Sequence, residues 1–410
     1  MAPPRLTRTP ISRLAEGWGV PEQHFWLRGD RPAGPVRFDE RRGVWNVYGH
    51  HEAVRVLSDP GVFSSDTNRH FLPEPDDYES SGMLTQLDPP EHRALRRLVG
   101  GTFTPGGVAA LEPRITSLTR ELLDAVDDRD EIELIRDFAQ PLPMIVIACL
   151  LGVPSGDRDL FRHWAGELFP GTEPPSVAGN PEQDRNIDAA YDLSHRMTEY
   201  FAAHIDERRR RPEEDLLSRL VHAEIDGERL SDRALTAFVQ LLFLAGYVTT
   251  ALLLGNTALC LDAHPEHTAR LRSDRSGIPA AIEESLRLMT PFAVFHRVVT
   301  ERVELGGQRL EPGQIVALWL GAANRDEKVF SQPHVFDPAR DPNPHLGFGR
   351  GIHFCLGAPL ARLEGRIALG ALLDRFPRLR TDPDNPPIFL ASSEVSGPRL
   401  LPLLTGKGAS

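Results

Sequence analysis

Three cysteines and two lysines in 410 residues are the scarcest features of this sequence. The cysteines, Cys149, Cys260 and Cys355, are odd in number and form no C-x-x-C pair. The sequence therefore predicts no disulfide framework and is typical of a reducing compartment. The lysines are Lys328 and Lys407, so nearly all the positive charge is carried by arginine, whose forked N–H donors bind carboxylates.

Positive charge and apolar leader segments are also lacking. The net charge of −12 disfavours nucleic acid as the main partner. The N-terminal stretch MAPPRLTRTPISRLAEGWG has no apolar region of the kind found in signal peptides. No residue from Ala234 to Leu261 is charged, but polar side chains interrupt this run and arginines flank both of its ends. We therefore expect a buried central helix, no membrane association and a cytoplasmic, monomeric protein.

Apolar residues recur at helical spacing over most of the chain, which predicts a mainly α fold with a minor β region. The predicted helices are 89–101, 107–127, 135–152, 157–167, 184–209, 213–223, 231–261, 264–273, 278–289 and 357–375. The minor β-rich parts are predicted near 36–48, 294–320 and 386–404. Segments 61–85 and 169–183 lack a clear period and are predicted to be long functional loops. Since no linker or repeat is evident, residues 1–410 are expected to form a single domain.

The glycine-rich stretch HLGFGRGIHFCLGAPLARLEGR, residues 345–366, places Cys355 directly before a predicted helix. The helix dipole and its free N–H groups are expected to lower the pKa of the thiol and favour a thiolate. With His353 as a base, the thiolate could be a nucleophile, but Phe348 and Phe354 crowd the sulfur. Crowding suits a shielded ligand of haem iron better, and zinc would need further ligands at short spacing. Haem ligand, nucleophile and structural thiol remain the alternatives.

The same stretch resembles the haem-binding loop of the cytochrome P450 superfamily, whose pattern is F-G-x-G-x-H-x-C-x-G-x-x-L-A-R. The matching residues are Phe348, Gly349, Gly351, His353, Cys355, Gly357, Leu360, Ala361 and Arg362. The resemblance implies a cytochrome P450 fold, in which a long central helix covers haem b (iron protoporphyrin IX). It implies that Cys355 is the metal ligand, that Phe348, Gly349 and Gly357 contact the cofactor, and that the protein is a monooxygenase.

Further blocks extend the resemblance over essentially the whole chain. In DPPEHRALRRLV, His92 and Arg96 are similar to residues that meet a haem propionate. Arg297, in FHRVV, is similar to a second propionate-binding arginine, and His353 would be a third donor. Two propionate carboxylates need charge-assisted donors of this kind.

A structural network is implied by two other blocks. EESLR contains Glu284 and Arg287 at E-x-x-R spacing, one helical turn apart. Arg340, in FDPARDPNPH, is similar to the arginine that completes a buried Glu–Arg–Arg network in the family. The resemblance implies that this network braces the haem loop.

The central stretch LLFLAGYVTTALLLGN resembles the oxygen-binding helix of the family, A/G-G-x-D/E-T-T/S. The matching residues, expected to be catalytic, are Ala245, Gly246, Thr249 and Thr250. A helical threonine can donate to the carbonyl four residues back, here from Thr249 to Ala245. That bond, together with Gly246, could open a groove for dioxygen.

The acidic position of this pattern is occupied by Val248, which is the main departure from the family. Valine cannot relay protons, and Tyr247 cannot easily replace an acid because its pKa is high. Protons could reach Thr249 through water or a substrate group, the acid could be dispensable, or the oxidation could be atypical. An atypical oxidation would be oxidative coupling or a peroxide-driven step.

Substrate contacts are expected from the two long loops, the central helix, the segment after the E-x-x-R helix and the C-terminal tail. The named candidates are Val248, Phe292, Ala293, Val294, Ser392 and Ser393. They suggest a mostly apolar pocket for a medium-sized hydrophobic natural product of polyketide, macrolide or terpenoid type.

Electron delivery is expected to come from separate proteins, because no flavin or nicotinamide motif is present. The resemblance to soluble bacterial members implies NAD(P)H, a ferredoxin reductase and a ferredoxin. A basic patch for the ferredoxin is predicted from Arg93, Arg97, Arg350, Arg362 and Arg366. Two other classes stay open: a non-catalytic haem sensor, and a membrane protein spanning at 234–261.

Overall fold

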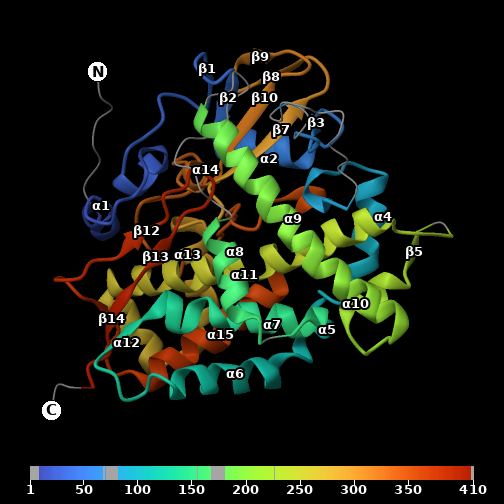
Figure 1. The fold of residues 1–410 in the computed structure, drawn as a ribbon. Coiled ribbons are helices and arrows are strands. Elements are labelled where there is room, and N and C mark those ends of the chain that lie inside the picture. The colour runs from blue at the N-terminus through green and yellow to red at the C-terminus, as the bar shows by residue number, and fades with distance from the viewer. Residues whose placement is uncertain are drawn as a thin grey trace.

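Helix α11 (Asp232–Asp262) runs through the middle of the molecule and is the element around which the helical part is built (Figure 1). The Ser231 hydroxyl caps its start by accepting the N–H of Ala234 at 3.2 Å. In the described part of the chain, α11 is the one helix long and apolar enough to cross a membrane, but 61% of its apolar window is buried inside the protein. Its apolar character is therefore that of a core helix, as predicted.

The structure is a computed structural model, and it describes residues 9–67, 70, 82–154, 156–167, 181–225 and 227–407. Its α-helices are α1 (Pro10–Ala15), α2 (His50–Ser58), α4 (Glu91–Gly100), α5 (Pro105–Ala109), α6 (Glu112–Asp124), α7 (Pro141–Leu151), α8 (Arg158–Glu167), α9 (Pro181–Arg210), α10 (Leu216–Val221), α11, α12 (Pro265–Ser273), α13 (Ile278–Leu288), α14 (Leu320–Ala323) and α15 (Ala358–Arg375). The short 3-10 or π segments are η1 (Glu22–Arg28), η3 (Leu84–Gln86), η4 (Ile135–Ala139), η5 (Arg275–Gly277) and η6 (Gly351–His353).

The strands lie mostly in the predicted β-rich parts. They are β1 (Val36–Asp39), β2 (Val44–Val47), β3 (Phe63–Ser64), β4 (Glu131–Glu133), β5 (Glu224–Ile225), β6 (Glu228–Arg229), β7 (Val294–Val299), β8 (Val303–Leu305), β9 (Gln308–Leu310), β10 (Ile315–Trp319), β11 (Arg380–Thr381), β12 (Ile388–Phe389), β13 (Pro398–Leu400) and β14 (Pro402–Leu404). Of the predicted loops, residues 169–180, 68–69 and 71–81 lie outside the described residues, and residues 181–183 already belong to α9.

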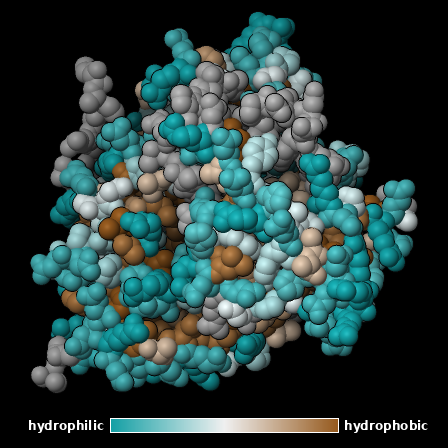
Figure 2. Space-filling model, viewed as in Figure 1, coloured by the Kyte–Doolittle hydropathy of each residue, from teal (hydrophilic) through white to brown (hydrophobic). Residues whose placement is uncertain are grey.

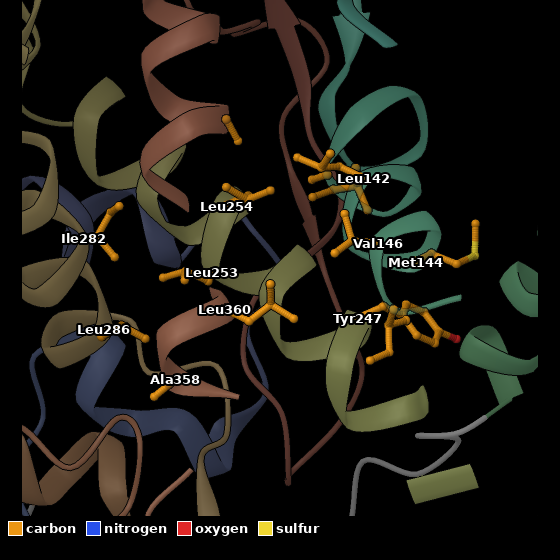
Figure 3. Packing of buried hydrophobic residues seen from close by; sticks show 14 of the residues in the cluster. Leu142, Met144, Val146, Tyr247, Leu253, Leu254, Ile282, Leu286, Ala358 and Leu360 are labelled. Atoms are coloured by element: carbon orange, nitrogen blue, oxygen red, sulfur yellow. The ribbon is translucent and has the colours of Figure 1, made fainter. Parts of the chain in front are cut away.

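The main hydrophobic core is built around α11 by four other helices. Helices α7, α9, α13 and α15 all pack against α11. Figure 3 shows side chains of α7, α11, α13 and α15 meeting in this core, among them Val146, Leu253, Ile282 and Leu360. Burial of such side chains supplies most of the driving force for folding. The core fixes α15, and therefore the loop before it, relative to α11.

A five-stranded mixed sheet forms the second layer, at the upper end of the molecule in Figure 1. The strand order is β1-β2-β10-β7-β3. Strand β10 runs parallel to β2 and antiparallel to β7, with Ile315 opposite both Val44 and Val298. This arrangement holds β7, which carries Arg297, beside the helical core.

Two predicted helices are each divided in the structure. The helix predicted at 107–127 is two helices, α5 and α6, and Pro113 lies in the first turn of α6. The helix predicted at 135–152 is the π-helical turn η4 followed by α7, which begins at Pro141. Proline lacks an N–H and is favoured in the first turn of a helix, so it marks a new start within an apolar run.

The face of the molecule in Figure 2 is mostly hydrophilic, with scattered hydrophobic patches between the polar side chains. Such a surface is ordinary for a globular protein, because apolar atoms cannot all be buried.

Candidate active site

The loop that carries Cys355 is shaped by glycines at positions that other residues would strain. Gly349 and Gly351 have φ values of 68° and 72°. A Cβ on Gly351 would also lie 2.2 Å from the carbonyl oxygen of Leu57, so the loop packs directly on the backbone of α2. The Cys355 N–H donates to the carbonyl oxygen of Phe348 at 2.8 Å. These constraints present the thiol just before the first turn of α15.

The electrostatics of Cys355 differ from the prediction. Burial raises the pKa of the thiol, although the N–H groups of Gly357 and Ala358 and the guanidinium groups of Arg96 and Arg362 act in the opposite direction. The expected lowering by the helix end is therefore real but smaller than the cost of removing a thiolate from water. A bound metal ion would reverse the balance, because coordination deprotonates a thiol.

A nucleophile assisted by His353 is not supported by the geometry. The Nε2 atom of His353 lies 2.8 Å from the Ser65 hydroxyl, and its ring contacts the His92 ring at an angle of 55°, with centroids 4.3 Å apart. Burial, together with the charges of Arg297, His92 and Arg96, lowers the pKa of His353 to about 3. Among the described residues no group of three His, Cys, Asp or Glu side chains could hold a metal ion. A multidentate zinc-type site is thus absent from that part of the protein.

Four basic side chains converge beside the cysteine loop. His92 and Arg96 come from α4, Arg297 from β7 and His353 from η6. Burial lowers the pKa of His92, Arg96 and His353, and for the two histidines the charges of other members of the group lower it further. Burial lowers the pKa of Arg297 to about 10, and only Asp88 acts in the opposite direction. The site therefore gathers two guanidinium groups and two imidazole rings, with Asp88 as the acidic group that acts on Arg297.

The donors in this group are incompletely satisfied within the protein. Arg297 is 8% exposed and donates to the carbonyl oxygen of His296 at 2.6 Å. The buried Nε2 of His92 has no hydrogen-bond partner among the described residues. Arg96 donates to the carbonyl oxygen of Phe354 at 2.7 Å. Buried donors without acceptors are costly, so this geometry suits an anionic ligand.

The α11 face with the predicted catalytic residues is open, unlike the rest of that helix. Ala245 is exposed and Val248 and Thr249 are partly exposed, whereas Tyr247 and Thr250 are buried. The Thr249 hydroxyl donates to the carbonyl oxygen of Ala245 at 3.1 Å, as predicted. The spacing of the open positions forms one stripe along the helix. At these positions α11 therefore has one accessible face.

Gly246 packs against α7, and Tyr247 is hydrogen-bonded to α8. A Cβ on Gly246 would lie 2.7 Å from Cγ1 of Ile147, so this glycine permits close contact between α11 and α7. The Thr250 hydroxyl lies 3.4 Å from the carbonyl oxygen of Gly246. The Tyr247 hydroxyl donates to the carbonyl oxygen of Phe161 at 3.0 Å, and burial raises its pKa. Tyr247 is therefore no substitute for a distal acid.

The residues present fit an iron porphyrin. Cys355 supplies one soft ligand, and the basic group supplies donors for two carboxylates. A Cβ on Gly357 would meet no other atom within 4 Å, so there is open space next to this glycine. Cys355 and Val248 both pack against the main core cluster, and α15, which begins just after Cys355, packs against α11.

Comparison with known proteins agrees with this arrangement. The family model for cytochrome P450 matches residues 38–397. The chain belongs to the cytochrome P450 family. It is an oxidoreductase monooxygenase, and membership implies a haem iron cofactor.

Relatives with assigned activities cover nearly the whole chain. It is 43% identical to cyclomarin C epoxidase of Salinispora arenicola, over 92% of this chain and 94% of that protein. It is 40% identical to erythromycin C-12 hydroxylase of Saccharopolyspora erythraea, over 93% of this chain and 94% of that protein. The crystal structure of HmtN, a post-tailoring hydroxylase involved in himastatin biosynthesis, is 50% identical, with a TM-score of 0.84 over 97% of this chain and 100% of that one. These similarities establish the P450 fold that the sequence predicted.

The E-x-x-R residues of this P450 form a fully buried network. Arg287 donates to Glu284 through Nε at 2.8 Å and through a terminal nitrogen at 2.7 Å, and both side chains have no exposed surface. Arg340 joins them, with Nε 3.3 Å from each oxygen of Glu284. Arg287 also donates to the carbonyl oxygens of Asn324 and Pro333. The structure thus brings together the three residues predicted to brace the haem loop.

The predicted substrate contacts in the segment after α13 and in the C-terminal tail differ in how exposed their side chains are. Phe292 is partly exposed, but Ala293 and Val294 are 0% and 1% exposed and pack in the main core. Ser392 and Ser393 are buried in the segment between β12 and β13, and the carbonyl oxygen of Ser393 lies 3.1 Å from Nε2 of His24. Among these residues, Phe292 is the one with an open side chain.

The predicted arginine patch is smaller than expected. Arg362 forms a two-point ion pair with Glu283, and Arg366 pairs with Glu112 at 2.9 Å. The other three predicted members are exposed: Arg93, Arg97 and Arg350. His345 also lies 3.0 Å from Glu283. Burial acts to raise the pKa of Glu283, but the hydrogen bonds and charges of Arg362 and His345 outweigh it and lower the pKa to about 2. The sequence analysis missed Glu283, although it directly precedes Glu284.

Proposed function

We propose that this P450 inserts one oxygen atom from O2 into a medium-sized natural product, as a tailoring hydroxylase or epoxidase. The observation that carries the proposal is the Cys355 loop beside the basic group and the open stripe of α11. The relatives named above act in natural-product chemistry as an epoxidase and as hydroxylases, which supports this substrate class. The polyketide, macrolide or terpenoid character of the substrate is part of the proposal.

When bound, the haem supplies the redox chemistry that activates dioxygen. Cys355 would hold its iron, with the N–H groups of Gly357 and Ala358 directed at the sulfur. His92, Arg96, Arg297 and His353 would hold its two propionate carboxylates. Phe348 and Gly349 would lie against the ring, and the Glu284–Arg287–Arg340 network would keep the loop in place.

On the distal side, Thr249 is the group that can hold and pass a proton. Its hydroxyl donates to Ala245 and keeps lone pairs that can accept from water. Because Val248 cannot supply protons, we propose that water or a polar group on the substrate delivers them to the Thr249 oxygen. Val248 itself, beside Thr249 on the open stripe, and Phe292 would contact the substrate.

The departure at Val248 favours a second candidate function. Without an acid, the enzyme could carry out an atypical oxidation, either oxidative coupling or a peroxide-driven step. Measured O2 consumption and incorporation of oxygen into product separate the two candidates.

We also propose that residues 1–410 form one catalytic domain that acts in the cytoplasm as a monomer. One core cluster extends from Ile11 to Leu403, which supports a single domain. Electrons would come from NAD(P)H through a ferredoxin reductase and a ferredoxin, which would dock near the exposed Arg93, Arg97 and Arg350.

The deciding experiment compares the purified protein with Cys355→Ser. The wild-type protein should bind haem and, when reduced under carbon monoxide, show the red-shifted Soret band of a thiolate ligand. With ferredoxin, reductase, NADPH and isotopically labelled O2, one labelled oxygen atom should enter a product. Cys355→Ser should lose both properties, and Cys260→Ser, in the buried part of α11, should keep them. An unchanged Soret band in Cys355→Ser would overturn the proposal.

A further inference from the structure

The segment between β12 and β13 carries an acidic side chain, Glu394, next to the region proposed to bind substrate. Its backbone is tied to the segment after α13. The Ala293 N–H donates to the carbonyl oxygen of Glu394 at 2.7 Å, and the Ser396 N–H donates to that of Pro291 at 2.8 Å. Phe292 pairs with Val395 in an antiparallel bridge. Glu394 is therefore held in a defined place and does not sit on a free loop.

The same segment is also tied to α11, close to the proposed catalytic threonine. The Asn256 amide donates to the carbonyl oxygen of Ser396 at 2.9 Å. A Cβ on Gly397 would lie 2.9 Å from Cδ2 of Leu252, which is one turn beyond Thr249. The segment thus lies beside the turn of α11 that follows the open stripe.

An aromatic pair connects this segment to the cysteine loop. The rings of Phe292 and Phe295 lie 5.0 Å apart at an angle of 32°, and both side chains are partly exposed. A Cβ on Gly349 would be 3.6 Å from Cε2 of Phe295. Val395, the bridge partner of Phe292, directly follows Glu394. The aromatic pair therefore lies between the segment that carries Glu394 and the loop proposed to hold haem.

The carboxyl group of Glu394 is unpartnered within the described part of the chain. No hydrogen bond or ion pair joins its oxygens to another described residue, and its neighbours Ser392, Ser393 and Val395 are buried. Burial alone raises the pKa of Glu394, yet the side chain is only half-buried. Because its neighbours are buried and its segment is tied both to α11 and to the residues after α13, Glu394 is placed at the edge of the space between these two elements.

We infer that Glu394 is a specificity-determining residue that pairs with a cationic nitrogen of the substrate, with Phe292 and Phe295 beside it. A desolvated carboxylate is best compensated by a buried opposite charge, and aromatic faces favour the same kind of group. A neutral substrate would leave the carboxyl unpaired in an apolar site, which is costly. The inference rests on the proposed function, because it assumes that this space is the substrate cavity.

The test uses the haem-loaded protein and three probes of equal chain length: decyltrimethylammonium, decanoate and decan-1-ol. The quaternary nitrogen cannot coordinate iron, so binding is read from the spin-state shift of the Soret band and from titration calorimetry. The cation should bind about tenfold more tightly than decanoate to the wild type. Glu394→Gln should weaken cation binding about tenfold and leave decan-1-ol binding within about twofold, because only the charge is removed.

Two further variants test whether the effect depends on the negative charge at position 394. Glu394→Asp, which keeps the charge on a shorter side chain, should retain part of the preference for the cation. Asp384→Asn, on an exposed site of the same C-terminal region, should bind all three probes as the wild type does. Equal cation affinity in the wild type and Glu394→Gln would overturn the inference, and so would a loss of turnover in that variant with unchanged probe binding. Failure of the proposed function is distinguished by the absence of the thiolate Soret band in the wild type.

Discussion

Val248 and Thr249 are adjacent on the open stripe of α11, and the two side chains differ in what they can do with a proton. The threonine hydroxyl can accept and donate, whereas the valine side chain can only exclude water or contact substrate. The Tyr247 hydroxyl donates a hydrogen bond to the carbonyl oxygen of Phe161, away from the open stripe. Proton delivery in this enzyme therefore depends on groups outside the local sequence motif.

Restoring an acid at this position is a direct test. Val248→Glu should leave turnover unchanged or raise it by up to about tenfold, because a positioned acid assists proton transfer. The rate of product formation and the fraction of NADPH lost to hydrogen peroxide check the effect. Val248→Leu, which keeps the position apolar, is the matched control. A complete loss of turnover in Val248→Glu alone would show instead that Val248 shapes substrate binding.

The contact between α7 and α11 requires a glycine in α11, whereas a glycine in α15 is not required by packing. Gly246 is required by packing, because Ile147 occupies the place where a Cβ would lie. Gly370 in α15 has no such restriction, since a Cβ there would lie 3.8 Å from Cδ1 of Ile278, an ordinary contact. A helical glycine is otherwise unfavourable because of its backbone entropy.

The two glycines should respond oppositely to alanine. Gly246→Ala should destabilise the protein, because overpacking costs about 1–3 kcal/mol and the gain in helix propensity is smaller. Gly370→Ala should stabilise it by about 0.5–1 kcal/mol. Urea unfolding of the haem-loaded protein measures both changes. Adding Ile147→Ala should recover part of the loss in Gly246→Ala, and no recovery would mean that the contact with α7 is not its cause.

For the molecule as a whole, a net charge of −12 coexists with exposed arginines near the cysteine loop. Arg362 and Arg366 are neutralised by Glu283 and Glu112, so the basic surface is narrower than the sequence indicates. Long-range steering depends on unpaired exposed charge and is screened by salt. Arg93, Arg97 and Arg350, which form no ion pair with another described residue, are thus the proposed determinants of ferredoxin docking.

Electron transfer should therefore depend on ionic strength. The rate of haem reduction by reduced ferredoxin should fall about tenfold as salt rises from low to high concentration, since steering is lost. Arg97→Glu should lower the low-salt rate, and Arg366→Gln, at a position already paired with Glu112, should change it much less. Stopped-flow absorbance at the Soret band measures these rates. Rates independent of salt would contradict the proposed docking surface.

Much of this protein could be read from short-range patterns. The glycines of the cysteine loop, the capped start of α11 and the E-x-x-R pair depend on neighbours within a turn or two, so their geometry follows from local spacing. The breaks at Pro113 and Pro141 were missed because an apolar run continues across each of them.

The tertiary structure decided what long-range packing controls. Burial by distant segments, and not the local helix end, sets the direction of the Cys355 pKa. Pairing with α13 and α6 removes Arg362 and Arg366 from the predicted patch, and α7 gives Gly246 a packing role. The place of Glu394 beside Phe292 likewise depends on a bridge between segments far apart in the chain. Local sequence cannot specify these features because desolvation and charge pairing depend on which segments meet in space.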